Sequence, residues 1–193
     1  MSVKWYSYWM WLHWLIRFKI AKVDTVLDIG CGIRPQNIIK PRTHICCDPY
    51  KPYLEDLRDK EADKRYVLLH ADWEKAINIF LPKSIDTIFL LGVIEHVAKK
   101  KAVKLLEKTE KIARKQIVIY TPLGFSPQNH PDGIDAWGMK GGKWQEHLSG
   151  WELKDFGDSW QIFACKNYIQ VDNVGKKLEK PCGAFWAIKN YVS

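Results

Sequence analysis

Short apolar runs alternate with segments of helical periodicity from Val23 onward, and this alternation constrains the fold more than any other feature. The apolar runs are rich in β-branched and aliphatic residues, which is typical of strands buried on both faces of a sheet. Five such strands are predicted at Thr25–Ile29, His44–Cys47, Tyr66–His70, Thr87–Leu91 and Gln116–Tyr120. Helices are predicted between them at Tyr53–Glu61, Trp73–Phe80 and Ala98–Lys115, the last with Val103, Leu106 and Ile112 facing inward. This pattern favours a doubly wound, mostly parallel α/β sheet.

The C-terminal third continues the pattern more loosely. A short helix is predicted at Trp151–Phe156, and two further strands at Gln161–Ala164 and Ala184–Ile188. The chain has 193 residues and contains neither an internal repeat nor a linker-like segment. We therefore expect a single domain over residues 1–193.

Composition excludes several classes of protein. With 47% hydrophobic and 27% charged residues, the chain is not collagen-like, low-complexity or disordered. Its net charge of +8 permits anionic partners without identifying one. The five cysteines are odd in number and form no C-x-x-C pair, so we expect no disulfide framework and a reducing, cytoplasmic location. Cys46 and Cys47 fit the end of a buried strand as small hydrophobic residues.

The N-terminal segment, residues 1–22, is crowded with aromatic side chains. At helical spacing it forms two apolar stripes, one of Trp5, Trp9, Leu12 and Ile16 and another of Tyr8, Trp11, Leu15 and Phe18. The segment is too short and too polar to span a bilayer, and it lacks the features of a secretory signal. We expect a helix that packs on its own domain as a lid, lies on a membrane surface or forms a dimer contact. Its basic residues would suit an anionic leaflet.

Acidic residues follow three of the predicted strands. The first strand leads into Asp28-Ile29-Gly30-Cys31-Gly32, where two glycines allow a sharp turn close to a ligand. Asp48, 20 residues after Asp28, is placed to accept hydrogen bonds from both hydroxyls of a ribose. Asp72-Trp73 follows the third strand and could hold an adenine. Each position alone also fits a turn glycine, a helix N-cap or a core Trp.

Two segments carry a family resemblance. Val26–Gly32 resembles the first motif of the class I S-adenosylmethionine-dependent methyltransferases, and Asp86–Val97 resembles their fourth-strand motif in ubiquinone- and menaquinone-biosynthesis members. Asp28–Gln36 and Gln145–Trp151 also resemble segments of small methyltransferases found with envelope-glycan genes. The resemblance implies a seven-stranded sheet with a reversed terminal hairpin and S-adenosylmethionine as cofactor. The predicted cofactor residues are Asp28, Gly30, Cys31, Gly32, Asp48, Pro49, Asp72, Trp73, Leu91 and Gly92.

The chain departs from this family directly after Gly32. Residues 33–36 read Ile-Arg-Pro-Gln and Pro41 follows, which leaves room for barely one helical turn before the second strand. The first crossover is therefore predicted to be abbreviated. Because a short crossover covers less of the cofactor, we expect the N-terminal aromatic helix to be needed beside this loop.

A long segment, residues 123–150, is predicted to form the acceptor side of the site, because loops of this length in compact domains are usually functional. Gly141-Gly142 could supply a hinge. Trp137, Trp144 and Trp151 offer flat faces for a sugar ring or lipid-like acceptor, or else pack the loop down. Ser149 is first of all a candidate N-cap for the helix that follows.

His96 and His147 are the candidate catalytic residues, because a general base of near-neutral pKa would assist methyl transfer to a hydroxyl group. We find no metal-ligand spacing and expect no metal. The favoured acceptor is a small molecule, a glycan or a lipid-linked group, methylated at oxygen. An RNA or protein methyltransferase and a non-catalytic binding module remain alternatives. Nucleic acid is disfavoured because Leu91–Ile94 stands where the Asn/Asp-Pro-Pro-aromatic cluster of nucleic-acid amino-methyltransferases would lie.

Overall fold

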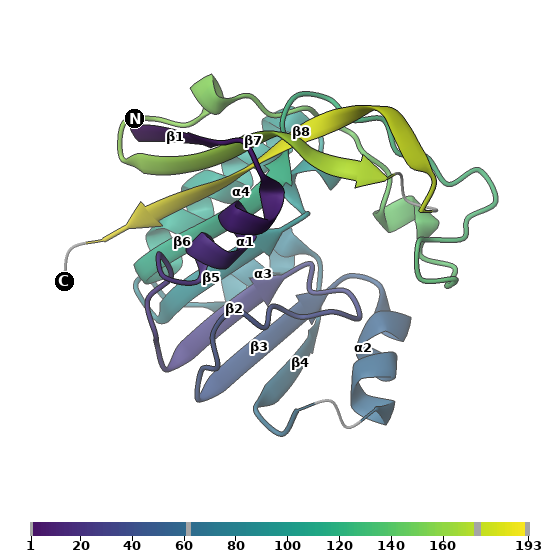
Figure 1. The fold of residues 1–193 in the computed structure, drawn as a ribbon. Coiled ribbons are helices and arrows are strands. Elements are labelled where there is room, and N and C mark those ends of the chain that lie inside the picture. Colours follow the sequence, from purple (N-terminus) through teal and green to yellow (C-terminus); the bar gives the residue numbers. More distant parts are fainter. Residues whose placement is uncertain (1, 61–62, 172–174, 192–193) are drawn as a thin grey trace.

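One eight-stranded sheet forms the centre of the protein, for which a computed structural model describes residues 2–60, 63–171 and 175–191 (Figure 1). Its strands, in chain order, are β1 Ser2–Tyr6, β2 Thr25–Ile29, β3 Thr43–Asp48, β4 Tyr66–His70, β5 Ile85–Leu91, β6 Ala113–Pro122, β7 Trp160–Val171 and β8 Lys177–Asn190. They lie in the order β1-β7-β8-β6-β5-β2-β3-β4. β8 runs antiparallel to β6 and β7, whereas the other neighbouring pairs are parallel. The predicted α/β class and reversed terminal hairpin are confirmed.

The strand count differs from the expected seven because the N-terminal segment begins with a strand. β1 pairs in parallel with β7, with Val3 opposite Ile162. Val3, Trp5 and Tyr6 are residue types that favour a strand at least as well as a helix. Pairing with β7 also satisfies backbone groups of β1 that an isolated extended segment would leave to water. The expectation of one aromatic helix over residues 1–22 is therefore corrected, since α1 covers only Trp9–Ile16.

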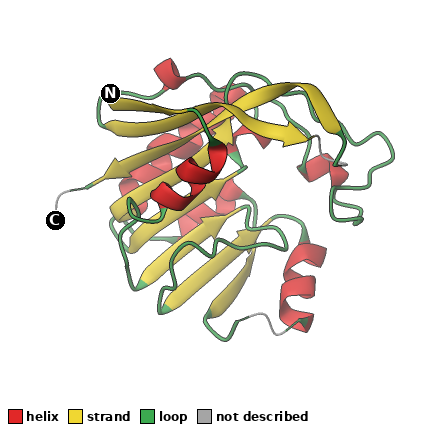
Figure 2. Cartoon of the chain, in the orientation of Figure 1, coloured by secondary structure: helices red, strands yellow, loops and turns green. Residues whose placement is uncertain are grey.

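The helices lie on both faces of the sheet (Figures 1 and 2). α1 buries Leu12 and Ile16 completely, against strand residues that include Phe89 and Trp186. Each such burial contributes roughly 1.5–3 kcal/mol to stability. Of the second predicted stripe, Tyr8, Trp11 and Phe18 are exposed and Leu15 is half-buried, so most of that stripe faces water instead. Met10 and Trp14 are exposed as well. The side chain of Trp9 lies outside the described part of the structure.

The other helices are α2 Lys51–Asp59, α3 Trp73–Ile79 and α4 Lys99–Ile112. They confirm the three predicted helices, although Glu61 lies outside the described residues and α4 ends at Ile112, because residues 113–115 of the predicted helix belong to β6. The inward face of α4 consists of Ala102, Leu105, Thr109 and Ile112. As predicted, Ile112 is buried and Leu106 packs half-buried against the core, whereas Val103 is 42% exposed, so one of the three predicted inward residues faces outward. Among the described residues, no helix is both long enough and apolar enough to cross a membrane.

Irregular backbone replaces a helix at two places. The connection from β2 to β3 contains no helix, as its prolines predicted. Gln36, which is buried, holds that connection by accepting from the backbone N–H groups of Ile38 and Ile39. Ile39 packs in the same cluster as Leu12 of α1, so α1 covers the face beside the abbreviated crossover. The predicted helix at residues 151–156 is only a 3-10 turn, Leu153–Asp155.

Candidate active site

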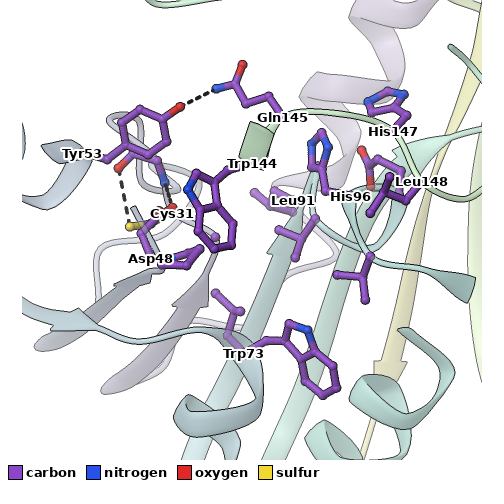
Figure 3. Close-up of a pocket in the computed structure, with 18 of the residues that line it drawn as sticks. Cys31, Asp48, Tyr53, Trp73, Leu91, His96, Trp144, Gln145, His147 and Leu148 are labelled. Atoms are coloured by element: carbon purple, nitrogen blue, oxygen red, sulfur yellow. Dashed lines mark hydrogen bonds between the residues drawn. The ribbon is translucent and has the colours of Figure 1, made fainter. Parts of the chain in front are cut away.

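The carboxyl ends of β2, β3, β4 and β5 open into one cavity of about 800 Å³ (Figure 3). This volume lies within the range of small-molecule sites, about 300–1,000 Å³. All ten predicted cofactor residues and both predicted catalytic histidines line the cavity. Residues of the 123–150 loop, among them Gln128 and Trp144, line it as well. Strand ends and loop thus enclose a common space.

The glycine turn after β2 requires glycine at both positions. Gly30 and Gly32 have φ values of 70° and 55°, a left-handed conformation that costs other residues energy. A Cβ on Gly30 would lie 2.7 Å from a methyl carbon of Val93. The backbone N–H of Gly32 donates to Oδ2 of Asp48 at 2.9 Å, which links the turn to the end of β3.

Asp28 is buried and holds the crossover as well as lining the cavity. Its Oδ2 accepts from the backbone N–H of Gln36 at 2.7 Å and lies 3.3 Å from Nε2 of His44. Burial alone would lower the pKa of His44, but hydrogen bonds with Asp28 and Cys46 outweigh it and raise this pKa to about 9. A protonated His44 therefore compensates a buried carboxylate at this end of the sheet.

Asp48 is 4% exposed and lies at the turn between β3 and α2. Its Oδ1 accepts from the N–H of Tyr50 at 2.8 Å, while Oδ2 accepts from Gly32. Burial raises the pKa of Asp48 to about 6, although both hydrogen bonds act to lower it. Each carboxylate oxygen retains a lone pair for a further donor, such as a ligand hydroxyl.

Asp72 and Trp73 close the cavity at β4. Oδ1 of Asp72 accepts from the N–H of Lys75 at 2.8 Å and caps α3, so the N-cap role considered from the sequence is present. Trp73 is half-buried and packs against the core while it lines the cavity. Both residues therefore have structural contacts and also line the cavity.

A buried carboxylate organises the 123–150 loop. Asp135 accepts from the hydroxyl of Tyr53 at 2.5 Å and from three backbone N–H groups, those of Trp137, Met139 and Gly141. Gln145 Nε2 donates to the same hydroxyl at 3.2 Å. This network fastens the loop to α2. A Cβ on Gly141 would lie 2.0 Å from the Tyr53 hydroxyl, so this glycine permits close packing here.

The three loop tryptophans have different positions. Trp137 lies over the glycine turn, where a Cβ on Gly32 would be 2.3 Å from its ring. Trp144 is 45% exposed and lines the cavity. Trp151 is 1% exposed and packs in the core beneath the Lys99 ammonium group, 3.7 Å from its ring centroid, so it offers no face to an acceptor.

Ser149 does not cap a helix, contrary to expectation. Its hydroxyl lies 3.0 Å from the carbonyl oxygen of Ile94 and 2.8 Å from that of Val97, and it accepts from Trp151 Nε1. The backbone N–H groups of Leu148 and Ser149 both donate to the carbonyl of Glu95. These bonds fasten the end of the loop to the turn after β5.

That attachment brings three polar side chains together: Glu95, His96 and His147, here called the Glu-His-His cluster. One ligand atom from each lies within 4.8 Å of the other two. The rings of His96 and His147 are 4.8 Å apart between centroids. Glu95 is 4% exposed and accepts from the Thr121 hydroxyl at 3.0 Å. Figure 3 shows both histidines on the side of the cavity opposite Asp48 and Tyr53.

Both histidines of the Glu-His-His cluster have a defined tautomer. His96 Nδ1 lies 3.0 Å from the carbonyl oxygen of Glu146, and His147 Nδ1 bonds to that of Ser126. Because a carbonyl only accepts, Nδ1 carries the proton and Nε2 is the unprotonated nitrogen. Burial lowers the pKa of His96 to about 4 and also lowers that of His147. Burial raises the pKa of Glu95 to about 7.

Comparison with solved structures identifies the fold. The chain aligns over 93% of its length with a SAM-dependent methyltransferase from Archaeoglobus fulgidus (TM-score 0.57, 14% identity, 90% of that chain). It aligns over 94% with a candidate methyltransferase from Bacillus halodurans (TM-score 0.61, 11% identity, 99% of that chain). A magnesium protoporphyrin IX methyltransferase from Synechocystis with bound SAM aligns over 93% (TM-score 0.55, 10% identity, 76% of that chain).

The protein thus has the Rossmann-like fold of the class I methyltransferases. No protein-family model matches the sequence, and no curated protein matches it. The likeness therefore lies in the arrangement of strands and helices and not in close sequence relationship.

Sequence reasoning missed several residues that build the site. Glu95 was visible only as the neighbour of His96, and no pattern linked it to His147, which is 52 residues further along the chain. The Tyr53–Asp135 contact joins residues 82 positions apart. Local spacing carries no signal for such pairs. The long loop itself was the available signal that distant residues would meet at the cavity.

Proposed function

We propose that the protein is an S-adenosylmethionine-dependent methyltransferase. One observation carries this proposal: Asp28, Asp48 and Asp72, at the carboxyl ends of β2, β3 and β4, all line the cavity. In open α/β sheets, ligands bind at this edge beside the topological switch point. That point here lies between β2 and β5.

Each strand end supplies a different part of the proposed cofactor site. The turn through Gly30 and Gly32 gives room for the methionine end, while Asp48 accepts hydrogen bonds from the ribose hydroxyls. Asp72 and Trp73 hold the adenine. Cys31, Pro49, Leu91 and Gly92 complete the walls.

Calorimetric titration with S-adenosylhomocysteine tests this assignment. We expect binding by the wild-type protein and a loss of at least tenfold in affinity for Asp48→Asn. Asp59→Asn is the matched control, because Asp59 lies in an exposed ion pair at the end of α2. If the wild-type protein does not bind S-adenosylhomocysteine, the proposed function is refuted.

We further propose that the acceptor is a small molecule, a glycan or a lipid-linked group. The exposed face of Trp144 suits a sugar ring or an apolar chain, and Lys101 and Lys143 line the cavity, where they favour an anionic group such as a phosphate. The fold alone does not distinguish among these classes of acceptor. Similar structures are methyltransferases of magnesium protoporphyrin, small RNA and phosphoethanolamine.

For methyl transfer to oxygen, His96 and His147 are the proposed catalytic residues. The acceptor oxygen would attack the methyl carbon as the carbon–sulfur bond breaks, and that electron pair would remain on sulfur. The acceptor proton would pass to an unprotonated Nε2. Alignment and exclusion of water supply most of the rate in such a displacement, and proton removal adds to it.

A labelled methyl group distinguishes the acceptor classes. Carbon-13-methyl S-adenosylmethionine, incubated with the protein and a cell extract, should place label in small-molecule or lipid-extractable fractions. The carbon chemical shift then separates oxygen from nitrogen acceptors. Label in RNA or protein would favour those alternatives, and cofactor binding without any transfer would favour a non-catalytic binding module.

We also propose that the exposed face of α1 contacts an anionic membrane surface at its cytoplasmic side. Trp11 and Trp14 on the outer side of α1 are 62% and 54% exposed, and Phe18, in the turn directly after α1, is 69% exposed. The opposite side of α1 is buried. Arg17 and Lys19 are exposed beside them. Aromatic side chains suit the membrane interface, and cationic ones are attracted to anionic lipid. None of the described α1 side chains lines the cavity, which disfavours a lid.

Flotation with phosphatidylserine-containing vesicles tests this contact. Deleting the segment would remove Leu12 and Ile16 from the core, so the sharper variant is Trp11→Ser/Trp14→Ser/Phe18→Ser. We expect the wild type to float and the triple variant to remain with the unbound protein. Ile79→Ser/Leu81→Ser is the control, since these residues are 57% and 75% exposed elsewhere. Equal flotation of both variants, or a dimer in solution that the triple variant abolishes, would contradict the proposal.

A further inference from the structure

The Glu-His-His cluster has features that proton transfer alone does not require. A single imidazole would suffice as a general base, yet two imidazoles and a carboxylate converge here. They come from the turn after β5 and from a loop fixed to that turn by the Leu148 and Ser149 N–H groups. All three residues line the cavity.

The orientation of both rings is the arrangement found at metal sites. Histidine ligands usually donate one ring N–H to a carbonyl or carboxylate, which directs the other nitrogen to the metal. His96 and His147 both donate from Nδ1 to backbone carbonyls, those of Glu146 and Ser126. His130 differs, because Gln128 lies against its Nε2 while its Nδ1 bonds to Ile134.

The spacing and the type of ligand select a class of cation. Bonds of roughly 2.0–2.2 Å from nitrogen and oxygen place neighbouring ligand atoms about 3.4 Å apart around a tetrahedral ion. The three ligand atoms lie within 4.8 Å of one another, so the side chains would move together by up to about 1.4 Å to bind one ion. Two imidazoles with one carboxylate suit zinc and similar divalent transition metals better than magnesium or calcium, which prefer oxygen ligands.

We propose that Glu95, His96 and His147 bind one divalent transition-metal cation, with the remaining coordination positions open to the cavity. The Thr121 hydroxyl orients Glu95 by donating to its Oε2. Binding of the cation does not depend on the methyl-transfer proposal. The role of the cation does rest on that proposal. An acceptor hydroxyl bound to the cation would be more acidic and would release its proton to water, so the cation would replace an imidazole as the activating group.

Equilibrium dialysis with Zn²⁺ and visible absorption spectra with Co²⁺ test the site in the full-length protein. We expect one cation per chain and absorption bands of a nitrogen- and oxygen-ligated Co²⁺ ion. His147→Gln and Glu95→Gln should each weaken binding at least tenfold. His70→Gln, a histidine outside the cluster, should leave it unchanged. Circular dichroism confirms that each variant is folded, and if either cluster variant is not, His96→Gln serves in its place.

Wild-type protein that binds no cation, or folded cluster variants that bind it as tightly as His70→Gln, would overturn the proposal. S-adenosylhomocysteine titration on the same samples separates the two proposals. Cofactor binding without cation binding would refute only the metal site, whereas the reverse would refute only the methyltransferase assignment. Once an acceptor is known, a chelator should abolish transfer and Zn²⁺ should restore it.

Discussion

Removing the Tyr53 hydroxyl tests how the loop that encloses the cavity is held. This hydroxyl donates to the Asp135 carboxylate at 2.5 Å and accepts from Gln145 Nε2 at 3.2 Å. Tyr53 and Asp135 are 2% and 6% exposed, so water cannot easily replace either bond. Tyr53→Phe leaves the ring in place and deletes only these interactions.

The expected cost follows from the two bonds. A hydrogen bond to a charged group contributes about 1.5–3 kcal/mol and a neutral one about 0.5–1.5 kcal/mol. Tyr53→Phe should therefore lower the free energy of unfolding by about 2–4 kcal/mol. At about 2–4 °C per kcal/mol for a chain of this size, the Tm should fall by about 4–16 °C.

Urea unfolding measures this effect against a matched control, Tyr50→Phe. The Tyr50 ring contacts that of Tyr53 at a centroid distance of 4.8 Å, and its hydroxyl makes none of the hydrogen bonds of the loop. The control should lie within about 0.5 kcal/mol of wild type, as for a surface change. Equal stability of the two variants would refute the anchoring role of the network.

The same network predicts a pH dependence. Burial alone would raise the pKa of Asp135, but hydrogen bonds from Tyr53 and three backbone N–H groups lower it below its usual 3.8. A lowered carboxyl pKa contributes stability that is complete above the unfolded-state value and is lost as the pH falls through the folded-state value. The difference between wild type and Tyr53→Phe should therefore shrink below about pH 4.

Two further predictions concern the cofactor side of the cavity. Burial raises the pKa of Asp48 to about 6. If only the ionised carboxylate binds, S-adenosylhomocysteine affinity measured by calorimetry should fall as the pH drops through 6, by up to about tenfold per pH unit. A flat affinity profile from pH 5 to 8 would contradict this. Gly32→Ala should destabilise the protein by about 1–2 kcal/mol from its left-handed backbone plus the clash with Trp137. In a Trp137→Ala background only the backbone cost should remain, and an identical cost in both backgrounds would show that Trp137 does not lie over the turn.

Most of the sheet was predictable because its signals are local. β2 and β4 have the predicted bounds, and β3, β5 and β6 extend the predicted strands by a few residues at one or both ends. The glycine turn and Asp48 were found because their roles depend on backbone conformation and on the position where a strand ends. The abbreviated crossover was equally visible, since proline excludes a helix interior.

Elements at the edges of the fold were harder to predict. The first residues of the chain form β1 because β7 offers an unpaired edge, which their own sequence does not reveal. α4 was predicted correctly as a helix with Leu106 and Ile112 toward the core, but Val103 is exposed, because its apolar side chain is no different in type from those that are buried. Trp151 was considered a candidate acceptor-binding residue and Ser149 a candidate helix N-cap. In the structure the two side chains are hydrogen-bonded to each other, and Ser149 stabilises the turn after β5.

The amino-acid sequence by itself determined the α/β class, the sharp turn after β2 and the acidic residues at the strand ends, since each depends on residues within a few positions of one another. Only the tertiary structure decided that His147 meets Glu95 and His96, and that Tyr53 holds Asp135. Those pairs lie 51 to 82 residues apart. Their contacts arise from packing of the whole chain, and no local periodicity records them.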